Sequence, residues 1–330
     1  MSPARETVVV TGATSGVGRA IARAFGRDGC NVALVARGQD GLAAAAGDVE
    51  AAGGKALELP TDVADFEQVE AAAAQVEETL GEIDVWVNNA MTTVFAFFED
   101  VDADEFRRAT EVTYLGSVWG FKAALTRMLP RDRGVIVQVG SALGKRGIPL
   151  QSAYCGAKHG VQGVFESLRC ELRNRGSNVH LTIVQLPGLN TPQFSHCRSK
   201  MPRKPMPVPP IYEPEIAADA VLWAARNRRR ELYVGIPTAY TIWGSNLAPW
   251  FAEWYLAKTG VDAQQTDDPL GTEVREGNLF APGDGDPGAH GDFDRQAHPR
   301  SLQLSLAKNR RTVAAAAGAL AAAALSLRRR

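Results

Sequence analysis

Short runs rich in valine, isoleucine and leucine alternate with alanine-rich stretches over most of this 330-residue chain. Continuous apolar runs are typical of parallel strands covered on both faces, and the intervening stretches have the composition of crossover helices. We predict strands at 7–11, 31–36, 55–59, 83–87, 135–140, 179–186 and 231–235. Right-handed crossovers then give a doubly wound α/β fold with a seven-stranded parallel sheet.

Helices are predicted at 17–28, 40–52, 65–79, 103–129, 152–175 and 214–227. Residues 190–214 break this rhythm because their seven prolines exclude a long regular element. In a doubly wound fold we expect this segment to lie next to the carboxyl ends of the strands. We interpret it as a substrate lid, and an inert surface loop is the alternative.

A glycine-rich turn connects the first predicted strand to the first predicted helix. The backbone N–H groups of such a turn can face a pyrophosphate, and glycine permits the close approach. A glycine pattern alone is weak evidence, since such turns also occur for packing. The turn supplies these candidate cofactor-binding residues: Gly12, Thr14, Ser15, Gly16, Val17 and Gly18.

Three polar residues are predicted to converge at the carboxyl edge of the sheet. Ser141 ends an apolar run, while Tyr154 and Lys158 are four positions apart and so share one face of a helix. A free phenol, with a pKa of about 10, is a poor proton donor near neutral pH. We expect the Lys158 ammonium to lower the pKa of Tyr154, and Ser141 to donate a hydrogen bond to the reacting oxygen.

The end of the second predicted strand indicates which dinucleotide is bound. Proteins that bind NAD usually carry an acidic residue about 20 positions after the glycine turn to hold the ribose 2′-hydroxyl. Ala36 and Arg37 stand there instead, and a guanidinium can pair with a 2′-phosphate. We therefore predict NADP(H) rather than NAD(H), although Arg37 could also belong to a simple surface turn.

Two further strand ends supply candidate cofactor contacts. Asp62 can accept the adenine amino group while Val63 packs on the ring, but an N-cap role for Asp62 would look the same. Asn89 and Ala90 follow the fourth strand, where an amide can line the crevice or tie neighbouring strands together.

The composition restricts partners and compartment. A formal net charge of −1 gives no field that favours nucleic acid, so we expect a small-molecule substrate, no nucleic-acid partner and no metal at the site. Four cysteines without C-x-x-C spacing, after a short charged start, indicate reduced thiols in the cytoplasm.

The region after residue 240 is predicted to be a separate extension, so that the domains are 1–240 and 241–330. It begins with an aromatic helical cap, continues with a loose Gly/Asp/Pro-rich segment at 277–294, and ends in an alanine-rich, basic-flanked helix at 308–330. Residues 313–327 would span only about 22 Å as a helix, short of a bilayer core of roughly 30 Å. The tail is therefore a candidate for packing on protein, or for peripheral membrane contact.

Together these motifs resemble the short-chain dehydrogenase/reductase family over about residues 5–236. The matching positions are Thr11-Gly12-x3-Gly16-x-Gly18, Asp62-Val63, Asn88-Asn89-Ala90, Ser141, Tyr154-x3-Lys158 and Pro187-Gly188 with Thr191. The resemblance implies a Rossmann fold, with Tyr154 as general acid/base, Lys158 on the nicotinamide ribose and Ser141 orienting the substrate. It also implies that Pro187, Gly188 and Thr191 border the nicotinamide, and that the protein is a homo-oligomer.

Two positions depart from the family pattern. Thr113 stands where the family usually has an Asn that anchors a water in the proton relay, so Thr113 is the candidate for that catalytic role. Met91 stands where the family commonly has glycine after Asn-Asn-Ala.

The interpretation is hydride transfer between NADP(H) and a secondary alcohol or ketone. An apolar substrate is expected because several apolar residues lie in segments that should ring the site. They are Phe95, Phe97, Phe98, Leu143, Ile148, Leu189 and Phe194. The alternatives are a catalytically silent cofactor-binding scaffold, and a nucleotide-sugar epimerase or dehydratase, whose usual glycine spacing differs from the one here.

Overall fold

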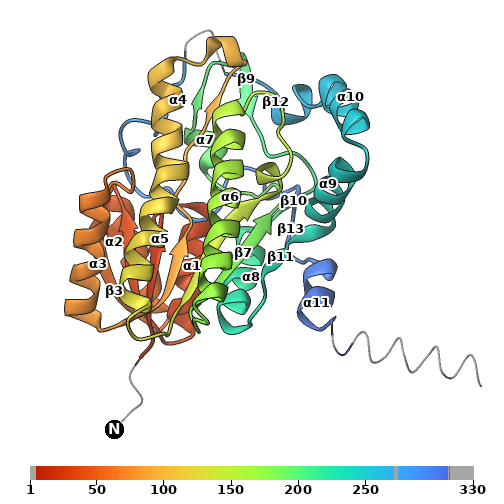
Figure 1. Ribbon diagram of the computed structural model, residues 1–330. Coiled ribbons are helices and arrows are strands. Elements are labelled where there is room, and N and C mark those ends of the chain that lie inside the picture. The colour runs from red at the N-terminus through yellow and green to blue at the C-terminus, as the bar shows by residue number, and fades with distance from the viewer. Residues whose placement is uncertain (1–4, 271–273, 311, 313–330) are drawn as a thin grey trace, which may run out of the picture.

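The computed structural model describes residues 5–270, 274–310 and 312 (Figure 1). Its centre is a seven-stranded parallel sheet in the order β11-β7-β6-β4-β1-β2-β3, which confirms the predicted doubly wound fold. The strands are β1 (Thr7–Thr11), β2 (Asn31–Ala36), β3 (Lys55–Pro60), β4 (Ile83–Asn88), β6 (Val135–Ser141), β7 (His180–Leu186) and β11 (Glu231–Tyr233). The last strand is shorter than predicted because Gly235, at φ +78°, already belongs to a helix.

Helices cover both faces of the sheet (Figure 1). On one face lie α1 (Gly16–Arg27), α2 (Gln39–Ala51) and α8 (Pro214–Arg226), and on the other lie α3 (Phe66–Leu80), α5 (Gly116–Met128) and α6 (Ser152–Asn174). Adjacent residues of β1 serve the two layers, since Val8 packs with the first group and Val9 with the second. Strands buried on both faces are mostly apolar, which explains the near-continuous runs in the sequence, although Gln138, Thr182 and Gln185 are buried polar residues within them.

The predicted helix 103–129 is interrupted. α4 (Ala103–Thr110) is followed by a π-helical turn, η2 (Glu111–Leu115), before α5 begins. Asp65, whose side chain accepts from the N–H groups of Glu67 and Gln68, caps α3. The alternative of Asp62 as the N-cap is therefore wrong.

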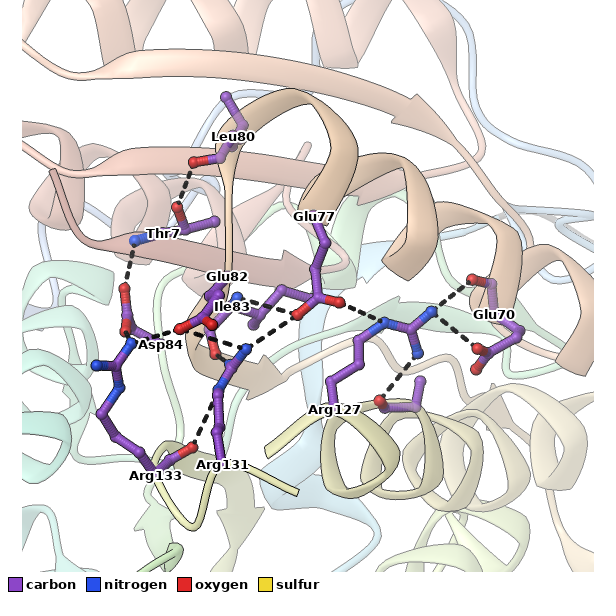
Figure 2. Close-up of polar contacts among 11 residues, drawn as sticks. Thr7, Glu70, Glu77, Leu80, Glu82, Ile83, Asp84, Arg127, Arg131 and Arg133 are labelled. Carbon is purple, nitrogen blue, oxygen red and sulfur yellow. Dashed lines mark hydrogen bonds and ion pairs between the residues drawn. The ribbon is translucent and has the colours of Figure 1, made fainter. Parts of the chain in front are cut away.

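An ion-pair network joins α3 to α5 near the amino ends of the strands (Figure 2). Arg127 on α5 pairs with Glu70 at 2.8 Å and Glu77 at 3.5 Å, both on α3, and Arg131 reaches Glu77 at 3.1 Å. The Arg127 side chain is largely buried, so the pair with Glu70 is better shielded than an exposed one. This network lies at the starts of β1 and β4, and the opposite, carboxyl edge carries the candidate site.

The proline-rich segment 190–214 contains only short elements, as predicted. They are α7 (Gln193–His196), β8 (Arg198–Ser199), β9 (Arg203–Pro205) and β10 (Ile211–Tyr212), and β8 pairs with β5 (Val94–Phe95). Two 3-10 turns, η1 (Phe98–Asp100) and η3 (Ala142–Gly144), lie before α4 and after β6.

The predicted aromatic cap consists of α9 (Gly235–Leu247) and α10 (Pro249–Thr259). Helix α9 follows directly on β11 and runs through residue 240. Then come η4 (Asp262–Gln264), β12 (Gln265–Pro269), β13 (Ala297–His298) and α11 (Leu302–Lys308). Apart from residues 308–310 and 312, the tail helix expected at 308–330 lies outside the described residues. Among the described residues, no helix is both long and apolar enough to cross a membrane.

Candidate active site

A cavity of about 1310 Å³ lies at the carboxyl edge of the sheet. Its wall brings together residues from separate parts of the sequence, as expected for ligand sites in open α/β sheets. The predicted site residues in this wall are Gly12, Thr14, Ser15, Gly16, Val17, Gly18, Arg37, Asp62, Val63, Asn89, Ala90, Ser141, Tyr154, Lys158, Pro187, Gly188 and Thr191. Thr113 is the one predicted site residue that does not contribute to it.

Other parts of the chain pack so closely against the turn that glycine is needed at positions 12 and 18. A Cβ on Gly18 would lie 2.0 Å from the carbonyl oxygen of Gly12, and one on Gly12 would lie 2.8 Å from Cα of Ala90. Gly12 and Gly16 also have φ values of +66° and +52°, which side chains rarely allow. The turn can therefore pack directly against Asn89 and Ala90, just after β4, while also forming part of the cavity wall.

Asn89 holds this turn in place. Its side-chain Nδ2 donates to the carbonyl oxygens of Thr11 at 2.9 Å and Gly12 at 3.2 Å, and its backbone N–H donates to the Thr11 hydroxyl. Asn88, its neighbour, is buried and accepts from Trp86 Nε1. Asn89 thus ties the end of β4 to β1, the structural role that the sequence left open, and also reaches the cavity wall. Asn88 instead joins β4 to α5, because its Nδ2 donates to the Ser117 carbonyl at 3.0 Å.

Ser141, Tyr154 and Lys158 lie together on the cavity wall. Ser141 is the last residue of β6 and accepts from the Leu143 N–H at 3.1 Å, while Tyr154 and Lys158 lie on the first turns of α6. Lys158 Nζ donates to the Val139 carbonyl at 2.9 Å and lies 5.7 Å from the centre of the Tyr154 ring. Both side chains are largely buried.

Burial changes the pKa of both groups. It raises the pKa of Tyr154 above its ordinary value of 10, and a hydrogen bond with Ser141 offsets only part of this rise. Burial also lowers the pKa of Lys158 to about 8. The expectation that Lys158 lowers the pKa of Tyr154 is thus not met in the protein by itself, because desolvation dominates for both side chains.

Thr113 is fully buried in the π-helical turn. Its hydroxyl donates to the Thr92 carbonyl at 2.9 Å and accepts from the Thr92 N–H at 3.0 Å. These bonds fasten the turn to the segment after β4, and the neighbouring Val112 reaches the cavity instead. The Thr113 hydroxyl is thus bonded to Thr92 within the protein, and its role in a proton relay stays a prediction.

Arg37 and Asp62 meet other parts of the chain at the edge of the cavity. The Arg37 guanidinium donates to the carbonyls of Asn278 at 2.5 Å, Leu279 at 3.3 Å and Phe280 at 3.1 Å. Burial lowers the pKa of Arg37, and the nearby Arg108 adds to this effect. Asp62 forms an ion pair with Arg108 and accepts from the N–H of Ala64 at 3.0 Å.

Residues 278–294, which we call the strap, cross the mouth of the cavity. Beyond Arg37, Arg19 binds Asp286 at 3.0 Å, and the Gly16 N–H donates to the Gly288 carbonyl at 3.0 Å. The strap then reaches Asn190, whose Oδ1 accepts from the Phe293 N–H at 3.0 Å.

The strap has no helix or strand, as its composition predicts, but it is not loose. Leu279 is fully buried in a small apolar cluster with Val94, Ala96 and Ala153, and anchors the start of the strap. Sequence reasoning missed these contacts, because they join residues more than 100 positions apart.

The segment 190–214 also covers the cavity and meets the end of the strap, since Ser195 Oγ donates to Asp292 at 2.9 Å. The Tyr212 N–H donates to the Gly188 carbonyl at 3.0 Å, and a Cβ on Gly188 would lie 2.6 Å from the Val208 oxygen. Pro187, Gly188 and Thr191 therefore lie in the wall beneath this segment, which itself contributes Pro192–Cys197 and Met206–Pro209 to the lining.

The apolar residues predicted around the site divide into two groups. Leu143, Ile148, Leu189 and Phe194 line the cavity. Phe95 does not, because β5 pairs with β8 and turns the ring into a separate core with Leu150 and Cys197. Phe97 and Phe98 are exposed beside η1. The expectation is therefore wrong for these three phenylalanines.

Comparisons with known proteins agree with this geometry. The sequence profile of the family described as short chain dehydrogenase matches residues 6–202. An uncharacterized oxidoreductase of Bacillus subtilis is 33% identical over 70% of this chain and 65% of its own length. A 3-dehydrosphinganine reductase of Danio rerio is 38% identical over 57% of this chain and 58% of its own length. The chain thus matches about three-fifths of the length of these curated relatives.

Among solved structures, a metagenomic short-chain oxidoreductase in complex with NADP is similar, with a TM-score of 0.59 and 29% sequence identity. The match covers 69% of this chain and 96% of that one.

Proposed function

Because this chain belongs to the short-chain dehydrogenase family, we propose that it transfers hydride between NADP(H) and a secondary alcohol or ketone with an apolar body. The observation that carries this proposal is the convergence of Ser141, Tyr154 and Lys158 in one cavity with the glycine turn. A Ser, a Tyr and a buried Lys beside a glycine turn have no shared structural purpose. Together they are the groups that proton transfer next to a dinucleotide needs.

The cavity wall fits a dinucleotide. The glycine turn, Val63 and Ala90 all contribute to the cavity wall, although the Gly16 N–H is bonded to the strap. When bound, reduced nicotinamide would supply the hydride. We propose that Lys158 binds the ribose next to the nicotinamide. Pro187, Gly188 and Thr191 would border the nicotinamide ring.

Tyr154 is proposed as the proton donor to the reacting oxygen. Its raised pKa keeps the phenol protonated at neutral pH, which is the form that an acid needs for carbonyl reduction. Ser141, which hydrogen-bonds Tyr154, would donate to the same oxygen and hold it for transfer. Lys158 is fixed on the Val139 carbonyl, so its positive charge would favour the phenolate that remains after proton transfer.

NADP(H) is proposed over NAD(H) on the basis of Arg37. No acidic side chain follows β2, and the guanidinium lies in the cavity wall with Arg108 nearby. A 2′-phosphate would meet two cations there, both of which have partners within the protein: Arg37 is bonded to strap carbonyls and Arg108 to Asp62. The complex of the similar short-chain oxidoreductase with NADP supports the same choice.

The substrate is proposed to be apolar and larger than a simple alcohol. The cavity of about 1310 Å³ would hold the dinucleotide as well as the substrate, so the nature of the substrate is inferred from the wall beyond the proposed dinucleotide site. Beyond Ser141 its wall continues through Leu143, Ile148 and Phe194 to Leu256 on α10. A relative that is a 3-dehydrosphinganine reductase supports carbonyl reduction as the physiological direction.

The test is NADPH oxidation with ketones of increasing chain length, using the wild-type protein and Tyr154→Phe. We expect turnover that improves with chain length, and a loss of about a hundredfold or more in the variant, since general acid catalysis typically contributes that much. NADPH binding, measured by fluorescence, should be retained in the variant. Binding without turnover in both proteins would instead identify a catalytically silent scaffold.

A further inference from the structure

The three helices after β11 expose a surface of large apolar side chains, which we call the aromatic face. It carries ten of the fifteen large hydrophobic residues that are exposed among the described residues. They are Ile236, Tyr240, Trp243 and Leu247 on α9, Trp250, Phe251, Trp254 and Tyr255 on α10, and Leu302 and Leu306 on α11. The helices lie on one side of the molecule, and α9 contacts both of the others (Figure 1).

The spacing of these residues makes a continuous stripe on each helix. Positions 236, 240, 243 and 247 follow the three-to-four-residue repeat of one helix face, as do 250, 251, 254 and 255. Leu247 is 85% exposed and Trp250 is 71% exposed, so the stripe continues across the junction between α9 and α10. Exposed apolar patches larger than a few hundred Å² are rare on isolated proteins and mark interaction surfaces.

The chemistry of the face fits a lipid interface. Trp and Tyr are enriched where the apolar part of a bilayer meets its head groups, and the face has three Trp and two Tyr. Between residues 235 and 259 only Glu253 and Lys258 are charged. Lys258 Nζ lies over the Trp254 ring, 4.5 Å from its centre, so this positive charge is part of the aromatic face.

Further cations border the face beside α11. Arg228, Arg230 and Arg310 are exposed, and Arg229 donates to the Ala307 carbonyl of α11. Arg230 also pairs with Glu166 at 3.2 Å, so Arg228 and Arg310 carry most of this positive margin. An apolar surface with a basic margin attracts anionic lipid head groups and buries its side chains in the acyl boundary. The combination of an aromatic face and a basic margin therefore favours an anionic lipid surface, and a second copy of the chain is an outcome that the test distinguishes.

The face is continuous with the candidate active site. Tyr240, Leu247, Phe251 and Tyr255 are more than half exposed, yet they also line the cavity. These four residues therefore form an apolar rim where the cavity opens between α9 and α10. A molecule dissolved in a bilayer could move along this rim without entering water.

We propose that the aromatic face docks this protein on an anionic membrane surface and admits an apolar substrate from the bilayer. The docking rests on the face alone, and the route for the substrate rests on the proposed function. It differs from a tail anchor, since the docking residues belong to α9, α10 and α11.

The test compares sedimentation of the full chain with vesicles of mixed phosphatidylcholine and phosphatidylglycerol, and with phosphatidylcholine alone. Trp250→Glu/Trp254→Glu places charges in the centre of the face, at residues outside the cavity wall. Phe98→Glu, at a residue that is 69% exposed on η1, is the matched control. We expect the double variant to bind the mixed vesicles at least about tenfold more weakly, and the control to bind like wild type. Binding should be weaker without anionic lipid and at high salt.

Failure of docking and failure of the enzymatic proposal are distinguishable. Tyr154→Phe should bind vesicles like wild type. If the enzymatic proposal holds, the double variant should lose kcat/KM for a long-chain ketone in vesicles but keep it for a short water-soluble ketone. Docking would be overturned if wild type stayed in the supernatant, or if the double variant bound vesicles equally well. It would also be overturned if the face instead held two copies together, seen as a dimer that the double variant converts to monomer without any vesicle binding.

Discussion

The backbone N–H of Gly16 donates to the carbonyl oxygen of Gly288, 3.0 Å away. This bond joins the glycine turn after the first strand to the strap near the end of the described chain. The strap also binds Arg19 and Arg37, so a dinucleotide in the cavity would lie between the glycine turn and the strap.

Leu279→Ala should loosen the strap. The side chain is fully buried, and removing it leaves a void that costs about 2 to 5 kcal/mol at such sites. Because the strap covers the cavity mouth, we expect NADPH to dissociate about tenfold or more faster, measured by stopped-flow fluorescence. Leu302→Ala, at a residue that is 73% exposed, is the control and should release NADPH like wild type. Equal release from all three proteins would show that the strap does not retain the cofactor.

Arg37→Ala should weaken NADPH binding by about tenfold or more, with little effect on NADH, because only NADPH has a 2′-phosphate. Titration calorimetry with both cofactors measures the two affinities. Arg37→Lys keeps the charge but loses the planar fork, and should recover part of the difference. If NADH and NADPH weaken equally, Arg37 acts by holding the strap, and the assignment to the 2′-phosphate fails.

Lys158→Met should stabilise the protein at pH 7 while abolishing turnover. The folded protein holds the lysine pKa at about 8, against 10.5 in the unfolded chain, so the buried charge disfavours folding at neutral pH. Chemical denaturation should show a gain of up to about 3 kcal/mol at pH 7.

This gain should depend on pH in one direction. Between pH 8 and 10.5 the unfolded chain keeps a proton that the folded protein has lost, so the stability of wild type rises and the difference closes. Lys55→Met, at an exposed lysine, should show no such change. A gain that is constant from pH 7 to 10 would contradict a buried charged Lys158.

Tyr154 should ionise above pH 10 in the protein without cofactor, since burial raises its pKa. Ultraviolet difference spectra of wild type and Tyr154→Phe isolate this step from the other tyrosines. The hydrogen bond from Ser141 stabilises the ionised form of Tyr154. Ser141→Ala removes this bond and should therefore move the ionisation of Tyr154 to still higher pH. An ionisation near neutral pH, or one that Ser141→Ala leaves in place, would contradict this account.

Two helical glycines give a matched pair. Gly18→Ala forces a Cβ to within 2.0 Å of the Gly12 oxygen, so we expect a loss of stability of at least about 2 kcal/mol and a loss of NADPH binding. Gly47→Ala, within α2, meets nothing within 4 Å and should stabilise the protein by about 0.5 to 1 kcal/mol. Thermal unfolding compares the two, and similar effects would mean that the turn can relax.

The sheet could be predicted from the sequence because its central strands are buried on both faces and are therefore apolar at most positions. Ser141, Tyr154 and Lys158 could be found from spacing alone, since strand ends and a helix face fix where these side chains lie. The π-helical turn at Glu111–Leu115 could not, because its sequence continues an ordinary helical pattern.

Other parts of the site depend on contacts that no local pattern contains. The partners of Arg37 lie about 240 positions away, and the orientation of Phe95 is set by the pairing of β5 with β8. The pKa of Tyr154 likewise depends on how deeply the folded chain buries the ring, which spacing to Lys158 does not reveal.

The strap is also the last part of the cavity wall to be translated. When the first 240 residues have emerged, the sheet, the glycine turn and Tyr154 can already be in place, but the groove is still open along one side. A cofactor captured by the growing polypeptide could leave freely until residues 278–294 arrive. Under the proposed function, lasting binding of the dinucleotide therefore waits until residues 278–294 have been translated and folded over the cavity.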